Sequence, residues 1–343
     1  MVRVPAGRPA ARGNPLIGGR RRDPAGISLL AGALCAVGLG LPAVAADRQA
    51  PRLVIADVPL RIDRTLVLGA ARSGRRVVAV GERGAIFVSD NAGSDWTSQR
   101  AATTRTLTSV VALDDATWIG AGHGGALLRS EDGGKSARLI ETDAGTDSFL
   151  GLTVLSPTRV LAYGAFGLML RSDDAGRTWS RQQVIEEGFD RHITRVVSAG
   201  EMLLLVGESG TLAKSTDGGG TWTRLESPYE GSYFGAAVTP GGALLVFGMR
   251  GNVFRSADGG TTWEKVALTT RLPFFGALTR GDRSIVLTGG MGWLAVSDDD
   301  GRSFRLRRAA SRSVAGVFER ADGALVAYGE QGIHALAADA LND

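Results

Sequence analysis

The residues best suited to metal or nucleophilic chemistry are few and lie far apart in the chain. The 343-residue sequence contains three His, at 123, 192 and 334, and a single Cys, Cys35. No two of the His residues have the spacing of a metal-ligand pair, and one Cys permits neither an internal disulfide nor a Cys-ligated zinc site. No Gly-x-Ser-x-Gly motif marks a Ser nucleophile. We therefore expect no bound metal and no cofactor.

Tyr and carboxylate residues leave glycoside hydrolysis as the alternative chemistry. A glycosidase uses two carboxyl groups, or, in sialidases, a Tyr nucleophile with Arg residues on the substrate carboxylate. Tyr229 and Tyr233 lie near a predicted loop, and Glu186, Glu187 and Asp190 form an acidic cluster. Such a cluster is typical of a solvated surface, and the Arg-Ile-Pro motif common in sialidases is absent. A non-enzymatic protein is our main interpretation, and a carbohydrate-active protein that uses Tyr233 and loop acids is the alternative.

These residues are carried by a unit of about forty residues that recurs seven times. Each unit has a Gly-x-x-Gly turn and four short apolar stretches, such as 193–197, 202–206, 211–214 and 222–225. Short β-branched runs bounded by Gly or Asp indicate strands, and four strands per unit of this length is typical of a propeller blade. We predict an all-β fold, a seven-bladed β-propeller. The second Gly of the turn recurs in steps of 41, 42, 43, 41, 41 and 40 residues, at Gly84, Gly125, Gly167, Gly210, Gly251, Gly292 and Gly332.

The last unit is incomplete. Only eleven residues follow Gly332, enough for a third strand at 333–338 but not for a fourth. Ahead of the first unit, which begins near Thr65, the stretch 53–56 reads Leu-Val-Ile-Ala. We predict that this N-terminal strand completes the seventh blade and closes the ring, which would remove the exposed sheet edges.

A second motif, Ser-x-Asp-x-Gly-x-Thr-Trp, follows the third strand and is known as the Asp-box or BNR repeat. A carboxylate at this spacing accepts backbone N–H groups across the turn, while Gly supplies the positive φ. We interpret these Asp residues as structural braces of the turn rather than catalytic acids or metal ligands. The set is Asp132, Asp174, Asp217, Asp258 and Asp299, and Asn91 takes the place of Asp in the first unit.

The N-terminus has the pattern of an export signal. Arg20, Arg21 and Arg22 precede the apolar run 27–41, which is followed by small residues at 43–46. Fifteen apolar residues fall short of the roughly 20 that a spanning helix needs. We predict a signal peptide at 1–46 and a single propeller domain at 47–343, located in the periplasm, or in the thylakoid lumen if the source is an oxygenic phototroph. The export route and the cleavage of the signal stay open.

The net charge of +4 comes from the first 46 residues, which contain six Arg and one Asp. Residues 47–343 carry 33 basic and 34 acidic side chains. Without a basic excess, this region does not have the charge expected of a nucleic-acid-binding domain. We expect no nucleic-acid partner and a monomer.

Over residues 47–343, the seven units resemble the photosystem II stability/assembly factor family of Asp-box propellers. The resemblance rests on the repeated Gly-x-x-Gly and Asp-box motifs, the export signal and the length of a single propeller. It implies an exported, non-enzymatic scaffold that binds a membrane protein complex, a photosystem reaction centre or another envelope complex, during assembly or stabilisation. No motif here matches a photosystem-binding surface. A sialidase-like hydrolase, a glycan-binding protein and a purely structural periplasmic scaffold remain alternatives.

A partner-binding face can be proposed from the propeller topology. The loops joining second to third strands open on the face where the chain enters the innermost strands. Aromatic and Arg residues at such positions are typical of interaction hot spots. The alternative for each aromatic is packing between blades as the first residue of a strand. The candidates are Arg83, Arg105, Phe149, Phe166, His192, Tyr233, Phe234, Arg250, Phe274, Phe275 and Arg312.

Overall fold

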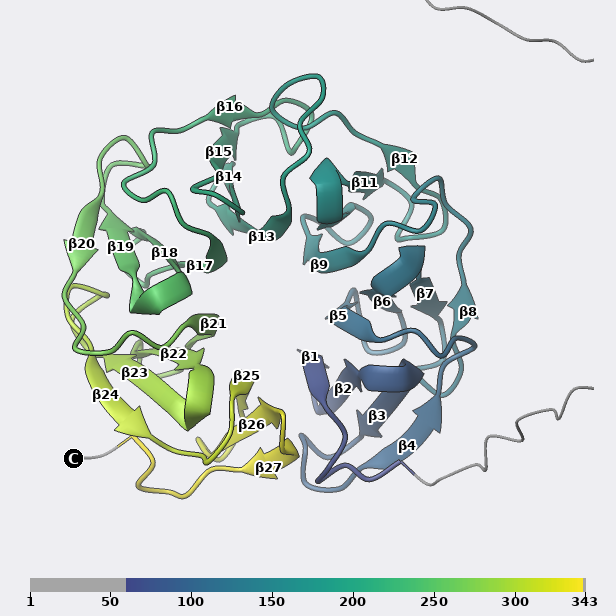
Figure 1. Cartoon of the computed structure of the whole chain (residues 1–343). Helices are drawn as coiled ribbons and strands as arrows, with labels where there is room; N and C mark the ends of the chain where they lie inside the picture. Colours follow the sequence, from purple (N-terminus) through teal and green to yellow (C-terminus); the bar gives the residue numbers. More distant parts are fainter. Residues whose placement is uncertain (1–59, 342–343) are drawn as a thin grey trace, which may run out of the picture. The chain divides into compact units, whose positions relative to one another are not determined.

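The computed structural model describes residues 60–341, which form a ring of seven β-sheets around a central channel (Figure 1). Six sheets contain four antiparallel strands in chain order, and the seventh contains three. The prediction of an all-β, seven-bladed propeller is confirmed. The predicted signal peptide and the boundary after residue 46 lie outside the described residues. Within residues 60–341, no helix is long and apolar enough to span a membrane.

The two inner strands of each blade surround the channel. The innermost strands are β1 (Val67–Ser73), β5 (Leu107–Ala112), β9 (Phe149–Val154), β13 (Ile193–Ala199), β17 (Tyr233–Val238), β21 (Phe274–Thr279) and β25 (Val314–Glu319). The second strands are β2 (Arg76–Gly81), β6 (Trp118–Gly122), β10 (Val160–Gly164), β14 (Met202–Gly207), β18 (Leu244–Gly248), β22 (Ile285–Gly289) and β26 (Leu325–Gly329).

The two outer strands of each blade lie toward the rim of the ring, where the third strands are largely buried and the fourth strands mostly exposed. The third strands are β3 (Ala85–Ser89), β7 (Leu127–Ser130), β11 (Met169–Ser172), β15 (Leu212–Ser215), β19 (Val253–Ser256), β23 (Trp293–Ser297) and β27 (Gly332–Ala335). The fourth strands are β4 (Thr97–Arg100), β8 (Arg138–Leu139), β12 (Ser180–Arg181), β16 (Thr223–Arg224), β20 (Glu264–Val266) and β24 (Arg305–Arg308).

The core lies between neighbouring blades. The second strands are mostly apolar because both faces of each sheet pack on another sheet; all five residues of β10 are buried. Leu161 and Tyr163 of that strand pack against Ile193 and Leu205 of the next blade. Apolar clusters of this kind recur around the ring and hold each blade to its two neighbours.

The turns between third and fourth strands are braced by the carboxylates identified in the sequence. The Asp258 carboxylate accepts hydrogen bonds from the Thr262 hydroxyl (2.6 Å), the Thr262 amide (2.9 Å) and the Ser256 hydroxyl (2.8 Å). These bonds lower the pKa of the Asp258 carboxyl to about 2. A carboxyl that is ionised at neutral pH holds no proton for general acid catalysis. The same pattern of donors surrounds the carboxylates of Asp132, Asp174, Asp217 and Asp299.

The two ends of the described chain meet in the seventh blade. The Ile333 amide donates a 2.9 Å hydrogen bond to the Ile62 carbonyl, and Leu60 and Ile62 pack in the same cluster as Val326. In the first blade, the carbonyl of Thr103, which lies just beyond β4, faces Gly84. In the seventh blade, the Ile62 carbonyl faces the equivalent residue, Gly332. Ile62 therefore occupies the position that follows a fourth strand. The predicted closing strand at 53–56 lies outside the described residues.

Candidate binding face and central cavity

The Gly-x-x-Gly loops form tight turns between second and third strands. In the first blade, η1 (Glu82–Gly84) closes with a hydrogen bond from the Ala85 amide to the Glu82 carbonyl. Both central residues of this turn, Arg83 and Gly84, have positive φ, 54° and 70°. This is the backbone of a type I′ turn, whose twist matches that of the flanking strands. Equivalent short turns are η2 (His123–Gly125), η3 (Ala165–Gly167), η4 (Met249–Gly251) and η5 (Gly290–Gly292), all on one face of the ring (Figure 1).

Four of these five turns, and the corresponding turn at 208–210, carry a side chain at a backbone position that favours Gly or Asn. We call the residues at this first central position the tip ring: Arg83, Gly124, Phe166, Ser209, Arg250 and Met291. The five members other than Gly have φ between 52° and 59°. A non-Gly residue in this region is uncommon and costs about 1 kcal/mol or more. Phe166 and Met291 expose 60% and 54% of their surface, so the strained tips present apolar groups to solvent.

Three of the proposed face residues are not accessible, which corrects the sequence interpretation. Phe149, Tyr233 and Phe274 are 0–1% exposed, because the first side chain of each innermost strand points between blades. The Tyr233 hydroxyl shares a hydrogen bond with the Ser227 hydroxyl at 2.9 Å. Burial raises the pKa of Tyr233 to about 12. A buried, protonated phenol is unsuited to the nucleophilic role considered for Tyr233.

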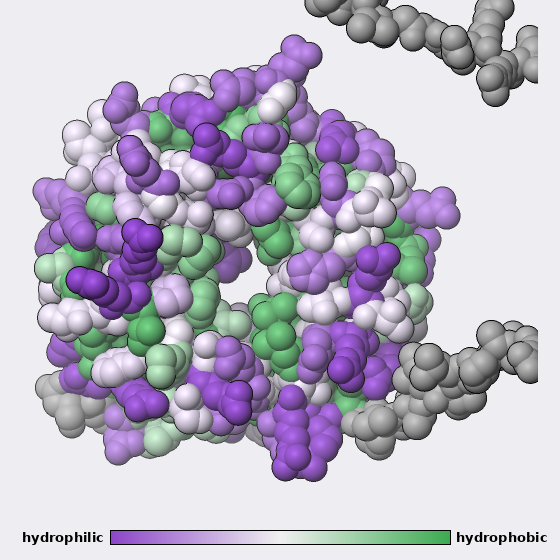
Figure 2. Space-filling view, in the orientation of Figure 1, coloured by the Kyte–Doolittle hydropathy of each residue, from purple (hydrophilic) through white to green (hydrophobic). Residues whose placement is uncertain are grey.

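The other eight proposed residues lie on the face as two aromatic pairs and four Arg residues. Phe166 and His192 form one contact on the rim, with ring centres 4.9 Å apart and the Phe166 amide donating to His192 Nδ1. Phe234 and Phe275 stack on each other at 6.0 Å, at the central cavity. The exposed cations of the face are Arg83, Arg105, Arg250 and Arg312. Figure 2 shows polar and apolar residues alternating around the opening in the middle of the ring.

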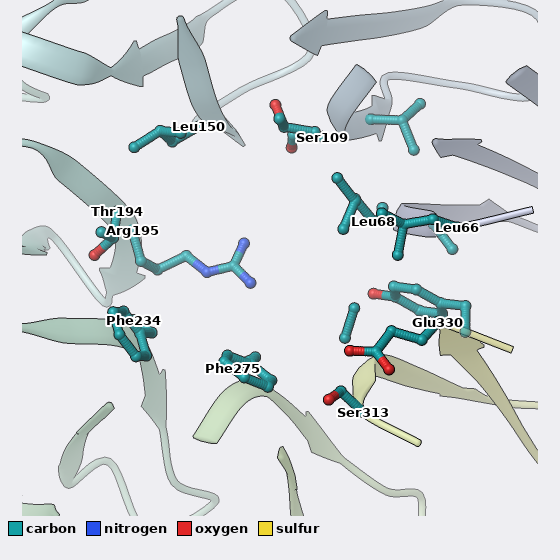
Figure 3. A pocket seen from close by; sticks show the side chains of 17 residues that line it. Leu66, Leu68, Ser109, Leu150, Thr194, Arg195, Phe234, Phe275, Ser313 and Glu330 are labelled. Carbon is teal, nitrogen blue, oxygen red and sulfur yellow. The ribbon is translucent and has the colours of Figure 1, made fainter. Parts of the chain in front are cut away.

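A cavity of about 490 Å³ occupies the channel where the chain enters the innermost strands. Leu66 and Leu68 line one side, and Phe234 and Phe275 line another (Figure 3). Arg195 of β13 extends its guanidinium into the space between them, and Glu330 lies near Ser313 (Figure 3). The cavity lining thus combines apolar and polar side chains, with one cation and one anion among them.

Arg195 departs from the repeat at a position that the sequence analysis did not single out. It is the third residue of its innermost strand, and five of the other six blades have Gly there. In three of those blades a side chain would strike an aromatic ring of the second strand: a Cβ at Gly151 would meet the Tyr163 ring, and one at Gly316 the Tyr328 ring. Arg195 pairs instead with the smaller Val206. Aligning the seven innermost strands exposes this exception: Gly69, Ser109, Gly151, Arg195, Gly235, Gly276 and Gly316.

The Arg195 guanidinium is without a protein partner. Within residues 60–341 no hydrogen bond or ion pair reaches it, and it is the one cationic side chain among the described residues that line the cavity. Glu330 lines the same cavity without forming an ion pair with it. Burial raises the pKa of the nearby Tyr328 phenol, and the positive charge of Arg195 opposes that rise. The phenol stays neutral at physiological pH, so Tyr328 supplies no negative charge to Arg195.

Comparison with known proteins finds similarity in structure alone. No model of a protein family and no curated protein sequence matches this chain. A structure of YCF48 bound to a D1 peptide superposes with a TM-score of 0.67 and 18% identity, covering 80% of this chain and 93% of that one. The chain shares the propeller fold of YCF48.

Two further structures show how widely this fold is used. YCF48 from Cyanidioschyzon merolae has a TM-score of 0.65 and 16% identity, over 80% of this chain and 96% of its own. An ancestral GH74 enzyme has a TM-score of 0.65 and 15% identity, over 80% of this chain and 45% of its own. At such identities the likeness is one of fold, because one propeller architecture carries many functions.

Proposed function

We propose that this chain is an exported, non-enzymatic scaffold that binds a membrane protein complex during its assembly or stabilisation. The tip ring is the observation that carries the proposal. Apolar tips at Phe166 and Met291 alternate around the face with cationic tips at Arg83 and Arg250. Exposed aromatic, Met and Arg side chains of this kind are enriched at protein interfaces.

The strain of the tips supports a role in binding. A type I′ turn accepts Asn-Gly without strain, yet these turns hold Phe, Met or Arg at the same position. Strained backbone positions that persist in a fold often belong to functional sites. The solved complex of YCF48 with a D1 peptide shows that a propeller of this shape can hold a polypeptide. We extend that mode of binding to this chain as part of the proposal.

The non-enzymatic part of the proposal rests on the polar groups themselves. Tyr233 is buried and protonated, and Asp258 and its counterparts are fully engaged as turn acceptors. The GH74 neighbour keeps a carbohydrate-active propeller as the competing function. Export to the periplasm, or to the thylakoid lumen in an oxygenic phototroph, follows from the signal pattern at 1–46 and belongs to the proposal.

Affinity purification from native membranes tests this function. Tagged residues 47–343 would be incubated with detergent-solubilised membranes of the source organism, and captured proteins identified by mass spectrometry. We expect subunits of one membrane complex, and loss of their capture in the double variant Phe166→Asn/Met291→Asn. Lys135→Asn, on an exposed turn of the opposite face, is the matched control.

Two results would overturn the proposal. One is the absence of any enriched membrane protein, after which glycan binding becomes the function to test. The other is capture that is unchanged in the double variant, which would remove the tip ring from the interface. Capture of photosystem reaction-centre subunits would identify the photosystem as the partner. Capture of another envelope complex would identify that complex as the partner instead.

A further inference from the structure

We infer that the central cavity binds a monocarboxylate carried on an apolar body, with Arg195 holding the carboxylate. This inference rests on the cavity and is independent of the tip ring. The site is built by one exception to the repeat, since Arg195 stands where the other blades have Gly or Ser. The fold itself does not require a cation at that position.

The guanidinium of Arg195, unpaired among residues 60–341, favours an anion beside it. Arg195 is half-buried, and no carboxylate of the described chain pairs with it. A guanidinium presents two parallel N–H donors that match a carboxylate, and a partly desolvated pair of this kind is stronger than one in water. A carboxylate ligand would therefore supply the missing counter-charge.

The walls of the cavity favour an apolar body on that anion. Phe234 and Phe275 stack on each other with planes inclined by 29°, and Leu66 and Leu68 line another part of the cavity (Figure 3). A volume of about 490 Å³ lies within the range of small-molecule sites, which are mostly apolar with a few polar groups that fix orientation. An aryl or branched alkyl group fits this lining.

Glu330 restricts the ligand further. Its carboxylate lines the same cavity and forms no ion pair with Arg195. A second carboxylate on the ligand would be placed near Glu330, where like charges repel. A ligand with a single negative charge is therefore favoured over a dicarboxylate. Such a carboxylate can come from a free acid or from the C-terminus of a polypeptide with an apolar last residue.

Calorimetric titration of residues 47–343 at pH 7 tests the inference. The probes are 3-phenylpropanoate, its uncharged amide, and one hexapeptide ending in Leu-Phe with either a free or an amidated C-terminus. We expect at least one free carboxylate to bind at least about tenfold more tightly than its matched amide, the size of one charge-assisted hydrogen-bond pair. Binding by the acid alone identifies a free acid as the source, and binding by the free peptide identifies a chain terminus.

Variants of Arg195 separate recognition from folding. Arg195→Ser copies the residue of the second blade, Ser109, and should keep the urea midpoint while weakening carboxylate binding at least about tenfold. Arg195→Lys should recover part of the affinity, because Lys keeps the charge without the two-pronged geometry. Lys135→Asn, on the opposite face, should bind the probes as the unmodified chain does. Equal affinity for acids and amides, no binding of any probe, or unchanged binding in a folded Arg195→Ser variant would each overturn the inference.

Discussion

The Thr262 hydroxyl donates a 2.6 Å hydrogen bond to one oxygen of the Asp258 carboxylate, while the Thr262 amide donates to the other oxygen at 2.9 Å. The Thr221 hydroxyl and the Asp217 carboxylate repeat this arrangement at 2.7 Å in the preceding blade. Both oxygens are thus acceptors in the native turn. The ionised carboxylate is part of the structure that joins the third strand to the fourth.

Acid should weaken the fold through these turns. The pKa of Asp258 in the folded protein, about 2, lies below its ordinary value of 3.8. A carboxyl whose folded pKa is lowered stabilises the fold above its unfolded pKa, and loses that contribution as the pH falls through the folded pKa. The contribution should be complete above about pH 4 and mostly lost near pH 2. The fall of the urea midpoint between pH 7, 4 and 2.5 measures the loss of this contribution to stability.

Asp258→Asn is the matched variant for this titration. In the first blade the Asn91 amide oxygen accepts the Asp95 amide hydrogen at 2.8 Å, so Asn can form the turn. The variant should have a lower urea midpoint than the unmodified chain at pH 7, and the gap should narrow at pH 2.5. A difference in urea midpoint that is the same at pH 7 and pH 2.5 would contradict the stabilising role of the ionised Asp258 carboxylate.

Replacing a tip residue by Asn should stabilise the protein. Met291 has a φ of 54°, which Asn adopts more readily, and its side chain is 54% exposed. We expect Met291→Asn to raise the free energy of unfolding by about 0.5–1 kcal/mol, measured by urea denaturation. Met249→Asn is the control, because Met249 precedes the positive-φ position in its own turn and is also exposed. Equal gains in both variants would show that strain at the tip is not the cause.

Alanine should be tolerated unequally around the channel. A Cβ at Gly316 would collide with the Tyr328 side chain beneath it, whereas the equivalent Arg195 already carries a side chain opposite Val206. We expect Gly316→Ala to lower the free energy of unfolding by about 1–3 kcal/mol, as overpacking does. Arg195→Ala should change it by less than about 0.5 kcal/mol. Thermal and urea unfolding measure both, and a tolerated Gly316→Ala would refute the packing argument.

A series of N-terminal truncations should locate the strand that closes the ring. A chain starting at Asp47 keeps the predicted strand at 53–56, and a chain starting at Asp57 lacks it. A chain starting at Thr65 also lacks Leu60 and Ile62. We expect stability to fall at each step, by about 2 kcal/mol or more at the last, because the apolar contacts of Ile62 with the seventh blade are then removed. Equal stability of the chains starting at 47 and 57 would contradict the prediction for 53–56.

The repeat made the architecture predictable, because the blade is specified locally. Gly84 and its counterparts mark every turn between second and third strands, and the four apolar stretches per unit became the strands of the six four-stranded sheets. The braced turns were also readable, since Asp258 and Thr262 are four residues apart and contact each other directly. Each of these features depends on residues within one unit.

The orientation of individual side chains was harder to predict. Tyr233 and Phe274 begin their strands and are buried, while the adjacent Phe234 and Phe275 line the cavity. The pairing of the innermost with the second strand shifts register after the first residue, and the sequence pattern does not show where such a bulge falls. Arg195 was not among the predicted site residues, because a single Arg in a strand does not by itself indicate a binding site. Its meaning depends on the six equivalent positions in other blades.

The hydrogen bond between Ile62 and Ile333 also sets an order of events during folding. Most contacts within a blade join residues of one unit, so the first six sheets can form from local stretches of chain. Ile62 and Ile333 lie near opposite ends of the sequence, and contacts between such distant residues are slow to form because long loops must close first. The seam of the ring can form only after nearly the whole chain has been synthesised. Until then the first and last blades each expose a face that the finished protein buries.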